Sequence, residues 1–250
     1  MSPEQDAVRQ LIRRLDVLGG GHEVLRRAAA RMLGELDPPR ATDLLSSVMR
    51  LSVERWEPAM RVLPAFMRAL EDDGDLIPHL QTLRQVAALY EQDEVTFVFS
   101  EGRPVQEYDS DAAARADAKL FTLPLGVLKS RARLTRNPDE LSRLAVASNA
   151  SVIREVLKNP RLTEDLVVRI AARRPARPEP LEEIWRSTRW NMQPAVRRAL
   201  VFNPYLSPEV GVKIVPLMAL PYLRELASDR NVHLSVRELA GRLSASASRR

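Results

Sequence analysis

Apolar residues over the first ninety positions recur every three or four residues, with charged residues between them. The run nearest the start of the chain consists of Val8, Leu11, Ile12, Leu15 and Leu18. This spacing puts the apolar side chains on one face of a helix, which glycines 19–21 end. A second helix is predicted over 22–35. The Pro38-Pro39 pair predicts an extended connection, after which a third helix begins at Ala41 or Thr42.

The helical pattern continues from position 56 to position 70 and closes at an acidic turn. Pro58 fits the first turn of this helix, where a missing N–H is tolerated. Pro64 lies in the middle and cannot donate to the carbonyl of Met60, so we expect the helix to kink or split near Leu63. A further helix is predicted over 77–90.

One segment departs from the helical pattern. β-Branched and aromatic residues occupy 95–100 and 105–108, and a turn with Gly102 and Pro104 separates them. This pattern predicts a small β-hairpin at 95–108, with an irregular loop as the alternative. Because two strands alone are marginally stable in water, the hairpin would have to pack against helices or a partner.

The second half of the chain contains an internal repeat marked by the dipeptide Asn-Pro. The pairs begin at Asn137, Asn159 and Asn203, so they lie 22 and then 44 residues apart, which is one period followed by two. Similar strings, VIREVLK and VRRALVF, precede the second and third pairs. At the skipped position near Leu181 the proline and the acidic residues remain, but the Asn is missing.

Each repeat has the composition of a helix with a defined start. Asn, Ser or Thr can cap the helix, Pro fits its first turn, acidic residues suit its N-terminal end, and Leu, Val and Ile follow at helical spacing. A helix pair spans 44 residues, within the range of about 40–47 typical of HEAT-like and armadillo-like repeats, which stack because none buries its apolar face alone. We therefore predict an all-α fold, a right-handed α-α superhelix of HEAT-like repeats interrupted by one small β-hairpin. A compact bundle whose helices share capping sequences is the alternative.

The repeats resemble the leucine-rich repeat variant and HEAT-like helical repeats of bacterial proteins. The resemblance is carried by VIREVLKNPRLTEDLVVRIAARRP and VRRALVFNPYLSPEVGVKIV and extends over about residues 123–243. It implies a helical-repeat architecture and a binding surface, without pointing to an activity. One family with a similar pattern carries a cysteine-ligated iron–sulfur cluster, and this feature is not transferred because the chain has no Cys.

The composition excludes several kinds of site. With 250 residues, 45% of them hydrophobic and 28% charged, the chain can bury a core. The lack of Cys excludes disulfides, thiolate zinc sites and cysteine nucleophiles, and three isolated His residues leave little for metal binding. No apolar run is long enough to span a membrane and the N-terminal region is charged, so we expect no membrane insertion, no secretory signal and a cytoplasmic location.

No pattern singles out a catalytic group. Asp73-Gly74-Asp75 could begin a calcium loop, but the twelfth position of such a loop is Arg84 where a glutamate belongs. Glycines 19–21 are not followed by a GK[ST] string, and no GxSxG, HExxH or kinase-type string occurs. We therefore predict a protein that is not an enzyme, with no catalytic residue, no cofactor and no metal.

Charge is distributed unevenly along the chain. Residues 1–125 contain 15 basic and 21 acidic residues, a net charge of −6, whereas residues 126–250 contain 23 and 12, a net charge of +11. A basic half can attract an acidic protein surface, nucleic acid or anionic lipid, and long-range attraction does not choose among them.

A stretch rich in Arg and Trp is the predicted interaction surface, because both residue types are enriched at binding hot spots and Arg also suits phosphate. Its residues are Arg169, Arg173, Arg174, Arg177, Trp185, Arg186, Arg189, Trp190, Arg197 and Arg198. The alternative is a solvated face on which glutamates 179, 182 and 183 pair with the arginines while both tryptophans belong to the core.

These features together predict a non-catalytic scaffold or adaptor that binds a protein with an acidic surface, in a bacterial signalling or polarity complex. Nucleic-acid binding is the alternative, followed by an enzyme of DNA-glycosylase type, which helical repeats can also build. An aromatic content of 5% favours the protein partner, because single-stranded nucleic acid is bound by stacking on aromatic side chains. The predicted organisation is an N-terminal helical region over 1–108, a linker or short helix over 109–120, repeats over 121–243 and a frayed tail over 244–250.

Overall fold

The computed structural model describes residues 3–18, 21–120 and 122–248. Throughout these residues the fold is helical, with sixteen α-helices, two short 3-10 helices and no strand. The chain forms two compact units. Unit 1 comprises residues 1–101, 212–228 and 234–250, and unit 2 comprises residues 102–211 and 229–233.

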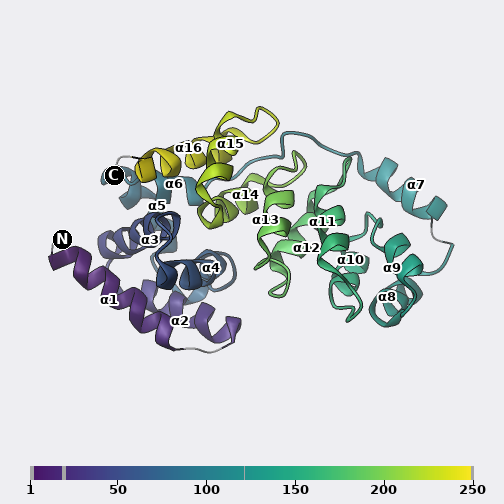
Figure 1. Ribbon diagram of the computed structural model, residues 1–250, viewed down its shortest axis with the longest axis horizontal. Helices are drawn as coiled ribbons and strands as arrows, with labels where there is room; N and C mark the ends of the chain where they lie inside the picture. The colour runs from purple at the N-terminus through teal and green to yellow at the C-terminus, as the bar shows by residue number, and fades with distance from the viewer. Residues whose placement is uncertain (1–2, 19–20, 121, 249–250) are drawn as a thin grey trace. The chain divides into compact units, whose positions relative to one another are not determined.

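The helices of unit 1 come from both ends of the chain (Figure 1). They are α1 (Pro3–Val17), α2 (His22–Glu35), α3 (Pro38–Val53), α4 (Glu57–Asp72), η1 (Gly74–Leu76), α5 (Leu80–Leu89), α6 (Asp93–Val98), η2 (Val215–Leu217), α15 (Leu220–Ser228) and α16 (Leu234–Ser248). Unit 2 contains α7 (Ser110–Leu120), α8 (Leu125–Leu134), α9 (Pro138–Leu144), α10 (Ala150–Leu157), α11 (Glu164–Ala172), α12 (Pro178–Arg186) and α13 (Pro194–Val201), and α14 (Pro208–Ile214) carries the chain back to unit 1.

The core of unit 1 forms where α4 packs against α2 and α3. Helix α16 packs on α15, α3 and α6, so the C-terminal residues complete the hydrophobic core that the N-terminal helices begin. Two ion pairs accompany this packing, Lys213 with Glu71 and Arg242 with Asp93. The structure therefore divides the chain differently from the predicted organisation, because the residues after 211 belong mostly with the N-terminal helices.

The expectation of an extended Pro38-Pro39 connection is wrong. Helix α3 begins at Pro38, and the side chain of Asp37 caps it by accepting from the backbone N–H of Arg40 at 3.0 Å. Both prolines lie in the first turn, where the missing N–H groups have no intrahelical partner to lose. The capping carboxylate therefore starts the helix three residues earlier than the apolar pattern suggested.

Helix α4 runs without a break through Pro64, so the predicted split is not seen. The lost hydrogen bond is outweighed because the residues from Val62 to Met67 are all buried between α2 and α3. Pro58 lies in the first turn, as predicted. Gly34 of α2 has a packing role, since a methyl group there would overlap the carbonyl oxygen of Leu76 in η1.

The predicted β-hairpin at 95–108 is also wrong. Residues 93–98 form α6, which buries Val95 and Val98 at helical spacing. Glu94 in its first turn accepts from the hydroxyl of Ser46 in α3 at 2.5 Å, which adds a tertiary contact that a strand would not make. Residues beyond α6 form an irregular segment, in which the N–H of Gln106 donates to the carbonyl of Pro204 at 3.0 Å.

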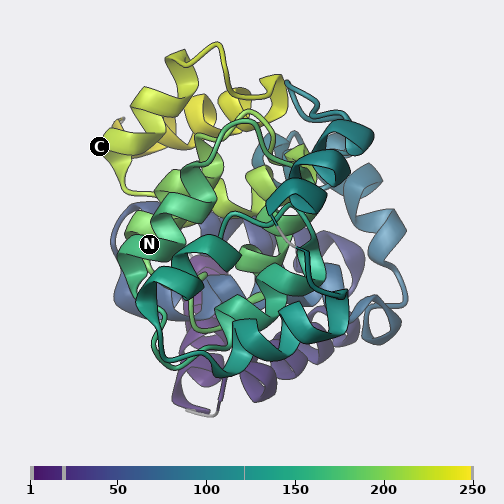
Figure 2. The same ribbon diagram turned by 90° about the vertical axis from the view of Figure 1, so that its right-hand side faces the viewer.

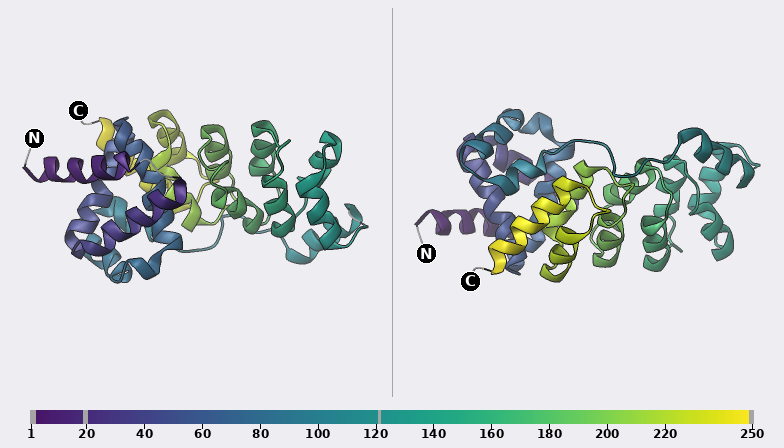
Figure 3. Two further views of the ribbon diagram at one scale, coloured as in Figure 1. Left: turned by 90° about the horizontal axis from the view of Figure 1, so that it is seen from below. Right: turned by 90° about the horizontal axis from the view of Figure 1, so that it is seen from above.

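The helices of unit 2 stack in order along the chain. Helix α8 packs against α10 and α10 against α12, while α11 packs against α13, so these helices pack at an interval of two along the chain. Figure 1 shows this row from α8 to α13, Figure 2 views it along its length, and both views of Figure 3 separate the successive pairs. Helix contacts at this interval produce two layers, one formed by α8, α10 and α12 and the other by α11 and α13.

The segment predicted as a linker or short helix is helical, and so is most of the predicted frayed tail. Residues 110–120 form α7, and Asp109 caps it by accepting from the N–H of Ala112 at 2.8 Å, which lowers the pKa of the Asp109 carboxyl group. Helix α16 continues to Ser248, and the last two residues of the predicted tail lie outside the described residues.

Candidate functional site

A buried asparagine joins the first two helix pairs of unit 2. The Nδ2 atom of Asn159 donates to the carbonyl oxygens of Ala132 at 2.8 Å and Thr135 at 3.0 Å, both at the end of α8. Its Oδ1 atom accepts from the backbone N–H of Arg161 at 2.8 Å. Since Asn159 is fully buried, these bonds replace those that water would make to its amide.

The same arrangement recurs 44 residues later. The Nδ2 atom of Asn203 donates to the carbonyl oxygens of Ala171 at 2.7 Å and Arg173 at 3.0 Å, and its Oδ1 atom accepts from the N–H of Tyr205 at 3.0 Å. Asn203 is also buried. The second and third Asn-Pro pairs therefore mark two equivalent junctions, in which a side-chain amide after one helix bonds to the C-terminal end of the helix two places earlier.

Only the first of the three Asn-Pro asparagines caps a helix. Asn137 is exposed, and its Oδ1 atom accepts from the backbone N–H groups of Asp139 at 2.9 Å and Glu140 at 3.4 Å at the start of α9. After Asn159 the cap is a threonine, since Oγ1 of Thr163 accepts from the backbone N–H of Leu166 at 3.4 Å at the start of α11. Helix α14 begins at Pro208, five residues after Asn203.

Both tryptophans of the predicted interaction surface belong to the core. Trp185 is fully buried and Trp190 is 4% exposed. The indole N–H of Trp190 donates to the carbonyl of Leu157 at 2.9 Å, and the guanidinium of Arg189 lies 4.3 Å from a ring centroid of Trp190. These side chains therefore stabilise the stack and present almost no area to a partner.

Several arginines of the predicted surface hold backbone carbonyl groups in place. The donors and acceptors are Arg173 to Val146, Arg174 to Phe202 at 2.6 Å, Arg189 to Asn159 and Leu162 at 3.4 Å, and Arg197 to Asn191 at 2.6 Å and Met192 at 2.8 Å. Carbonyl groups near helix ends lack intrahelical donors, so a guanidinium with its fork of N–H groups satisfies them well. Burial lowers the pKa of Arg197 to about 10, because the charged form loses hydration.

Other arginines of the predicted surface pair with glutamates. Arg177 pairs with Glu179 at 2.6 Å, and Arg186 pairs with Glu182 at 3.1 Å and Glu183 at 3.5 Å. The two that remain are exposed: Arg169 in α11, and Arg198 in α13, whose guanidinium lies 5.4 Å from the ring centroid of Phe202. The structure thus brings together few free cations in this stretch.

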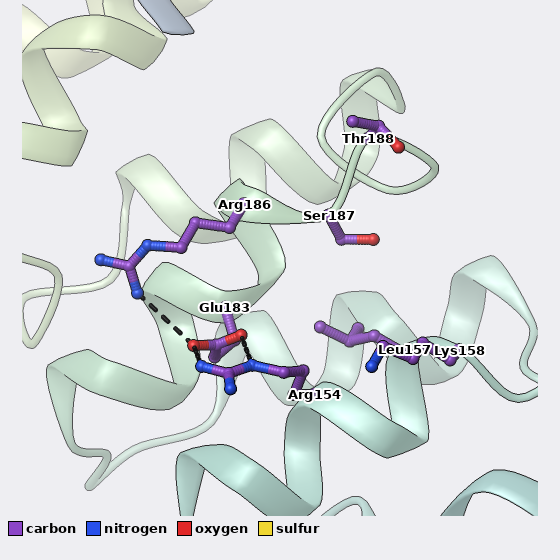
Figure 4. A pocket seen from close by; sticks show the side chains of 7 residues that line it. All are labelled: Arg154, Leu157, Lys158, Glu183, Arg186, Ser187 and Thr188. Carbon is purple, nitrogen blue, oxygen red and sulfur yellow. Dashed lines mark hydrogen bonds and ion pairs between the residues drawn. The ribbon is translucent and has the colours of Figure 1, made fainter. Parts of the chain in front are cut away.

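A pocket of about 470 Å³ lies between α10 and α12 (Figure 4). At its centre Arg154 donates through Nε and Nη2 to the two carboxylate oxygens of Glu183, at 2.7 and 2.5 Å. Glu183 is only 6% exposed. The hydrogen bonds from Arg154 lower the pKa of the Glu183 carboxyl group and raise that of Arg154. Each of the three cations that line this pocket is paired with a carboxylate, Arg154 and Arg186 with Glu183 and Lys158 with Glu155.

A second pocket, of about 510 Å³, has a different electrostatic character. It is lined by Arg133, Leu134, Thr135, Arg136, Lys158, Pro160 and Arg161, which include four cations and no carboxylate. We name it the basic pocket. It lies over the junction of Asn159, because its lining comes from the last turn of α8 with the loop after it and from the loop after α10, which this side chain joins.

The guanidinium groups of Arg133, Arg136 and Arg161 have no hydrogen bond or ion pair with any described residue. Lys158 pairs with Glu155 at 2.8 Å. Two carboxylates lie nearby: that of Glu155, and that of Glu140, which accepts from the Thr135 hydroxyl at 2.5 Å and from Arg131 at 3.2 Å. Three cations of the basic pocket therefore remain free to bind an anion.

Sequence reasoning missed the basic pocket, although a signal for it was present. The cations flank the first two Asn-Pro pairs directly, as RNP at 136–138 and KNPR at 158–161, and the third pair is FNPY. Counting the cations that adjoin each repeat marker would have found the pocket. The density of arginines along the chain instead pointed to residues 169–198, where most of the arginines bond to carbonyls or carboxylates.

No family model, curated protein or solved structure matches this chain. Among the described residues, no helix has the length and apolar character needed to cross a membrane. The described part of the chain also contains no cluster of three or more His, Cys, Asp or Glu side chains suited to holding a metal ion.

Proposed function

We propose that this protein is a non-catalytic adaptor that binds an acidic segment of a partner protein at the basic pocket of unit 2. The proposal rests on one observation. Arg133, Arg136 and Arg161 line one pocket without a carboxylate in its lining and have no ionic partner among the described residues. Most guanidiniums elsewhere in unit 2 are engaged by carbonyls or carboxylates, so this group is available for an external anion.

The net charge of unit 2 supports an acidic partner. Unit 2 contains 20 basic and 14 acidic residues, a net charge of +6, whereas unit 1 contains 18 and 19, a net charge of −1. A positively charged unit accelerates encounter with an acidic surface, and this long-range attraction weakens as salt screens it.

The lining of the basic pocket favours a protein segment over nucleic acid. Leu134 is 70% exposed and Pro160 is also exposed, so apolar surface adjoins the cations. None of the seven lining residues is aromatic, whereas sequence-tolerant binding of single strands depends on aromatic stacking. An acidic peptide that also carries an apolar side chain matches both parts of this surface.

Helices α8–α13 are, in this proposal, consecutive HEAT-like repeats and part of a superhelical stack. The matched hydrogen bonds of Asn159 and Asn203 support this assignment, as does the packing of α10 on α8 and of α13 on α11. The repeat unit is shorter than expected from the sequence, because three helices, α11 to α13, lie between the two asparagines where one helix pair was predicted. A stacked array presents its loops in a row, which is how such proteins form extended binding surfaces. A cytoplasmic bacterial signalling or polarity complex is the setting that we propose for it.

The test is affinity capture from the native cytosol at moderate salt, with and without nuclease, using three forms of the protein. The forms are the unchanged chain, R136E/R161E, and R31E/R84E as a control with the same change in net charge. Arg31 and Arg84 are exposed, lie in unit 1 and have no ionic partner among the described residues.

We expect a discrete protein to be captured by the unchanged chain and by the control variant, also after nuclease treatment. R136E/R161E should no longer capture it. Loss of all captured material on nuclease treatment would instead assign unit 2 to nucleic acid. Equal capture by R136E/R161E and the unchanged chain would show that the basic pocket is not the binding site.

A further inference from the structure

The basic pocket combines more positive charge than a single carboxylate would neutralise. Three guanidiniums and one ammonium line the same 510 Å³. Within the part of the chain that the structure describes, the only carboxylate paired with any of them is that of Glu155. A phosphate monoester carries a charge of about −1.5 to −2 near neutral pH and three acceptor oxygens. Guanidinium forks bind such oxygens in pairs, which makes an arginine cluster a characteristic phosphate site in proteins.

The cations are also held in a defined place. The loops that carry them end α8 and follow α10, and the buried amide of Asn159 bonds to both loops at 2.8–3.0 Å. Arg136 directly precedes Asn137, which caps α9, and the backbone N–H of Arg161 donates to Oδ1 of Asn159. Fixed backbone positions reduce the entropy lost when the side chains close on an anion.

We propose that the basic pocket binds a phosphoserine or phosphothreonine side chain in a segment of the partner, with a neighbouring apolar side chain of that segment against Leu134. This proposal deepens the proposed function and rests on it. The pocket is a surface depression, since Arg133, Leu134, Arg136, Lys158, Pro160 and Arg161 are all exposed. Such a shape admits an extended segment, and the exposed Leu134 gives that segment an apolar contact next to the phosphate.

The second junction does not offer the same site. There Arg174 donates to the carbonyl of Phe202 at 2.6 Å, and the residue after the Asn-Pro pair is Tyr205 where the first junction has Arg161. The proposal therefore assigns one phosphate site to unit 2, at the first junction.

The experiment titrates the full chain with four probes. They are N-acetyl-Leu-phosphoserine amide, N-acetyl-Leu-Ser amide, N-acetyl-Leu-Glu amide and inorganic phosphate, followed through the arginine Nε–H signals in NMR and by calorimetry. We expect the phosphoserine peptide to bind about tenfold more tightly than the glutamate peptide, and the serine peptide not to bind measurably. The signals of Arg133, Arg136 and Arg161 should shift, and that of Arg169 should stay in place.

Two variants complete the design. R161Q removes one free guanidinium and should weaken the phosphoserine peptide about tenfold, while L134A should weaken the peptide and leave inorganic phosphate unchanged. R169Q is the matched control, because Arg169 is exposed and has no ionic partner among the described residues. Thermal unfolding of each variant verifies that the fold is kept.

The pH dependence gives a further readout. Guanidinium groups are not deprotonated in proteins. The nearby carboxylate of Glu140 accepts from Arg131 and Thr135, and that of Glu155 accepts from Lys158. The second ionisation of a phosphate monoester has a pKa of about 6. Binding of the phosphoserine peptide should therefore weaken as pH falls from 7 to 5, and binding of the glutamate peptide should stay constant.

The other outcomes separate this inference from the proposed function. If the glutamate peptide binds as tightly as the phosphoserine peptide, the phosphate assignment is overturned and acidic-segment binding stands. If inorganic phosphate binds as tightly as the peptide and L134A changes neither, the site takes free phosphate and the peptide assignment is overturned. If no probe moves the three arginine signals, both the inference and the pocket's role in the proposed function fail.

Discussion

The junctions of Asn159 and Asn203 share their interior and differ at their surface. In both, a buried amide donates to two carbonyls at the end of the helix two places earlier and accepts from a backbone N–H two residues later. Around Asn203 the nearby arginines bind carbonyls, whereas around Asn159 three guanidiniums are left free. The asparagines that build the repeat therefore recur at both junctions, whereas the free arginines that we assign to binding occur at only one.

Removal of either buried asparagine tests whether the junctions are equivalent and should have the largest effect. N159A and N203A each leave two carbonyls and one N–H without partners in the core, so each should lower the free energy of unfolding by about 3 kcal/mol. N137A removes an exposed cap and should lower it by about 1 kcal/mol. Urea unfolding followed by circular dichroism measures all three, and an equal loss in N137A would contradict the junction role.

The pair of Arg154 and Glu183 lies between the two junctions and gives unit 2 a predicted acid sensitivity. The pKa of the Glu183 carboxyl group is lowered in the fold, so its contribution to stability is complete above its ordinary value of 4.5 and is lost as pH falls through the lower, folded value. E183Q should lower the unfolding free energy by about 2 kcal/mol at pH 7. It should also flatten the decline in stability below pH 4.5. An unchanged acid profile in E183Q would assign that decline to other carboxylates.

Trp190 separates packing from binding. W190F removes the indole N–H that bonds to the carbonyl of Leu157, and should lower the unfolding free energy by about 1–2 kcal/mol. Because Trp190 is buried, the affinity of the folded protein for its partner should not change. If folded W190F bound the partner less tightly than the unchanged chain, Trp190 would belong to the interaction surface.

Arginines that bind carbonyls and arginines that are free should differ most in their effect on partner binding, although both have small effects on stability. R174A removes a bond to the carbonyl of Phe202 and should lower the unfolding free energy by about 1 kcal/mol, with no effect on partner binding. R136E/R161E should change stability by less than about 0.5 kcal/mol, and it should abolish capture of the partner. Unfolding and partner binding are measured for both variants, and R174A should lose only stability while R136E/R161E loses only binding. Loss of the partner in R174A would contradict this expectation.

Most of the helices were predictable because their apolar residues recur at helical spacing. The bounds 22–35 expected for α2 are those observed, and Pro58 lies in a first turn as expected. Prediction failed where a side chain or a neighbouring helix outweighed the local signal. Asp37 caps a helix that begins with two prolines. Val95 and Val98 of α6 are buried where this helix packs on α3, α5 and α16, and this burial outweighs the strand preference of its β-branched and aromatic residues.

The candidate site was harder to predict than the fold. The net positive charge and the abundance of Arg after position 125 are properties of the sequence, and the alternative in which Trp185 and Trp190 belong to the core agrees with their burial. Which arginines are free depends on where unpaired carbonyls and carboxylates lie. Arg189 bonds to carbonyls about thirty residues earlier in the chain, and no local pattern announces such a partner.

Three features are visible in the amino-acid sequence: the helical spacing, the period of 22 and 44 residues, and the cations beside the first two Asn-Pro pairs. They depend on side chains close in the chain, whose spacing and capping chemistry act locally. Three others arise only from long-range packing: the bonds of Asn159 and Asn203 to earlier helices, the place of α16 in unit 1, and the lack of an ionic partner for Arg133, Arg136 and Arg161 among the described residues. Each of these outcomes depends on groups distant in sequence, because folding satisfies buried polar atoms with whichever donors the packing brings within reach.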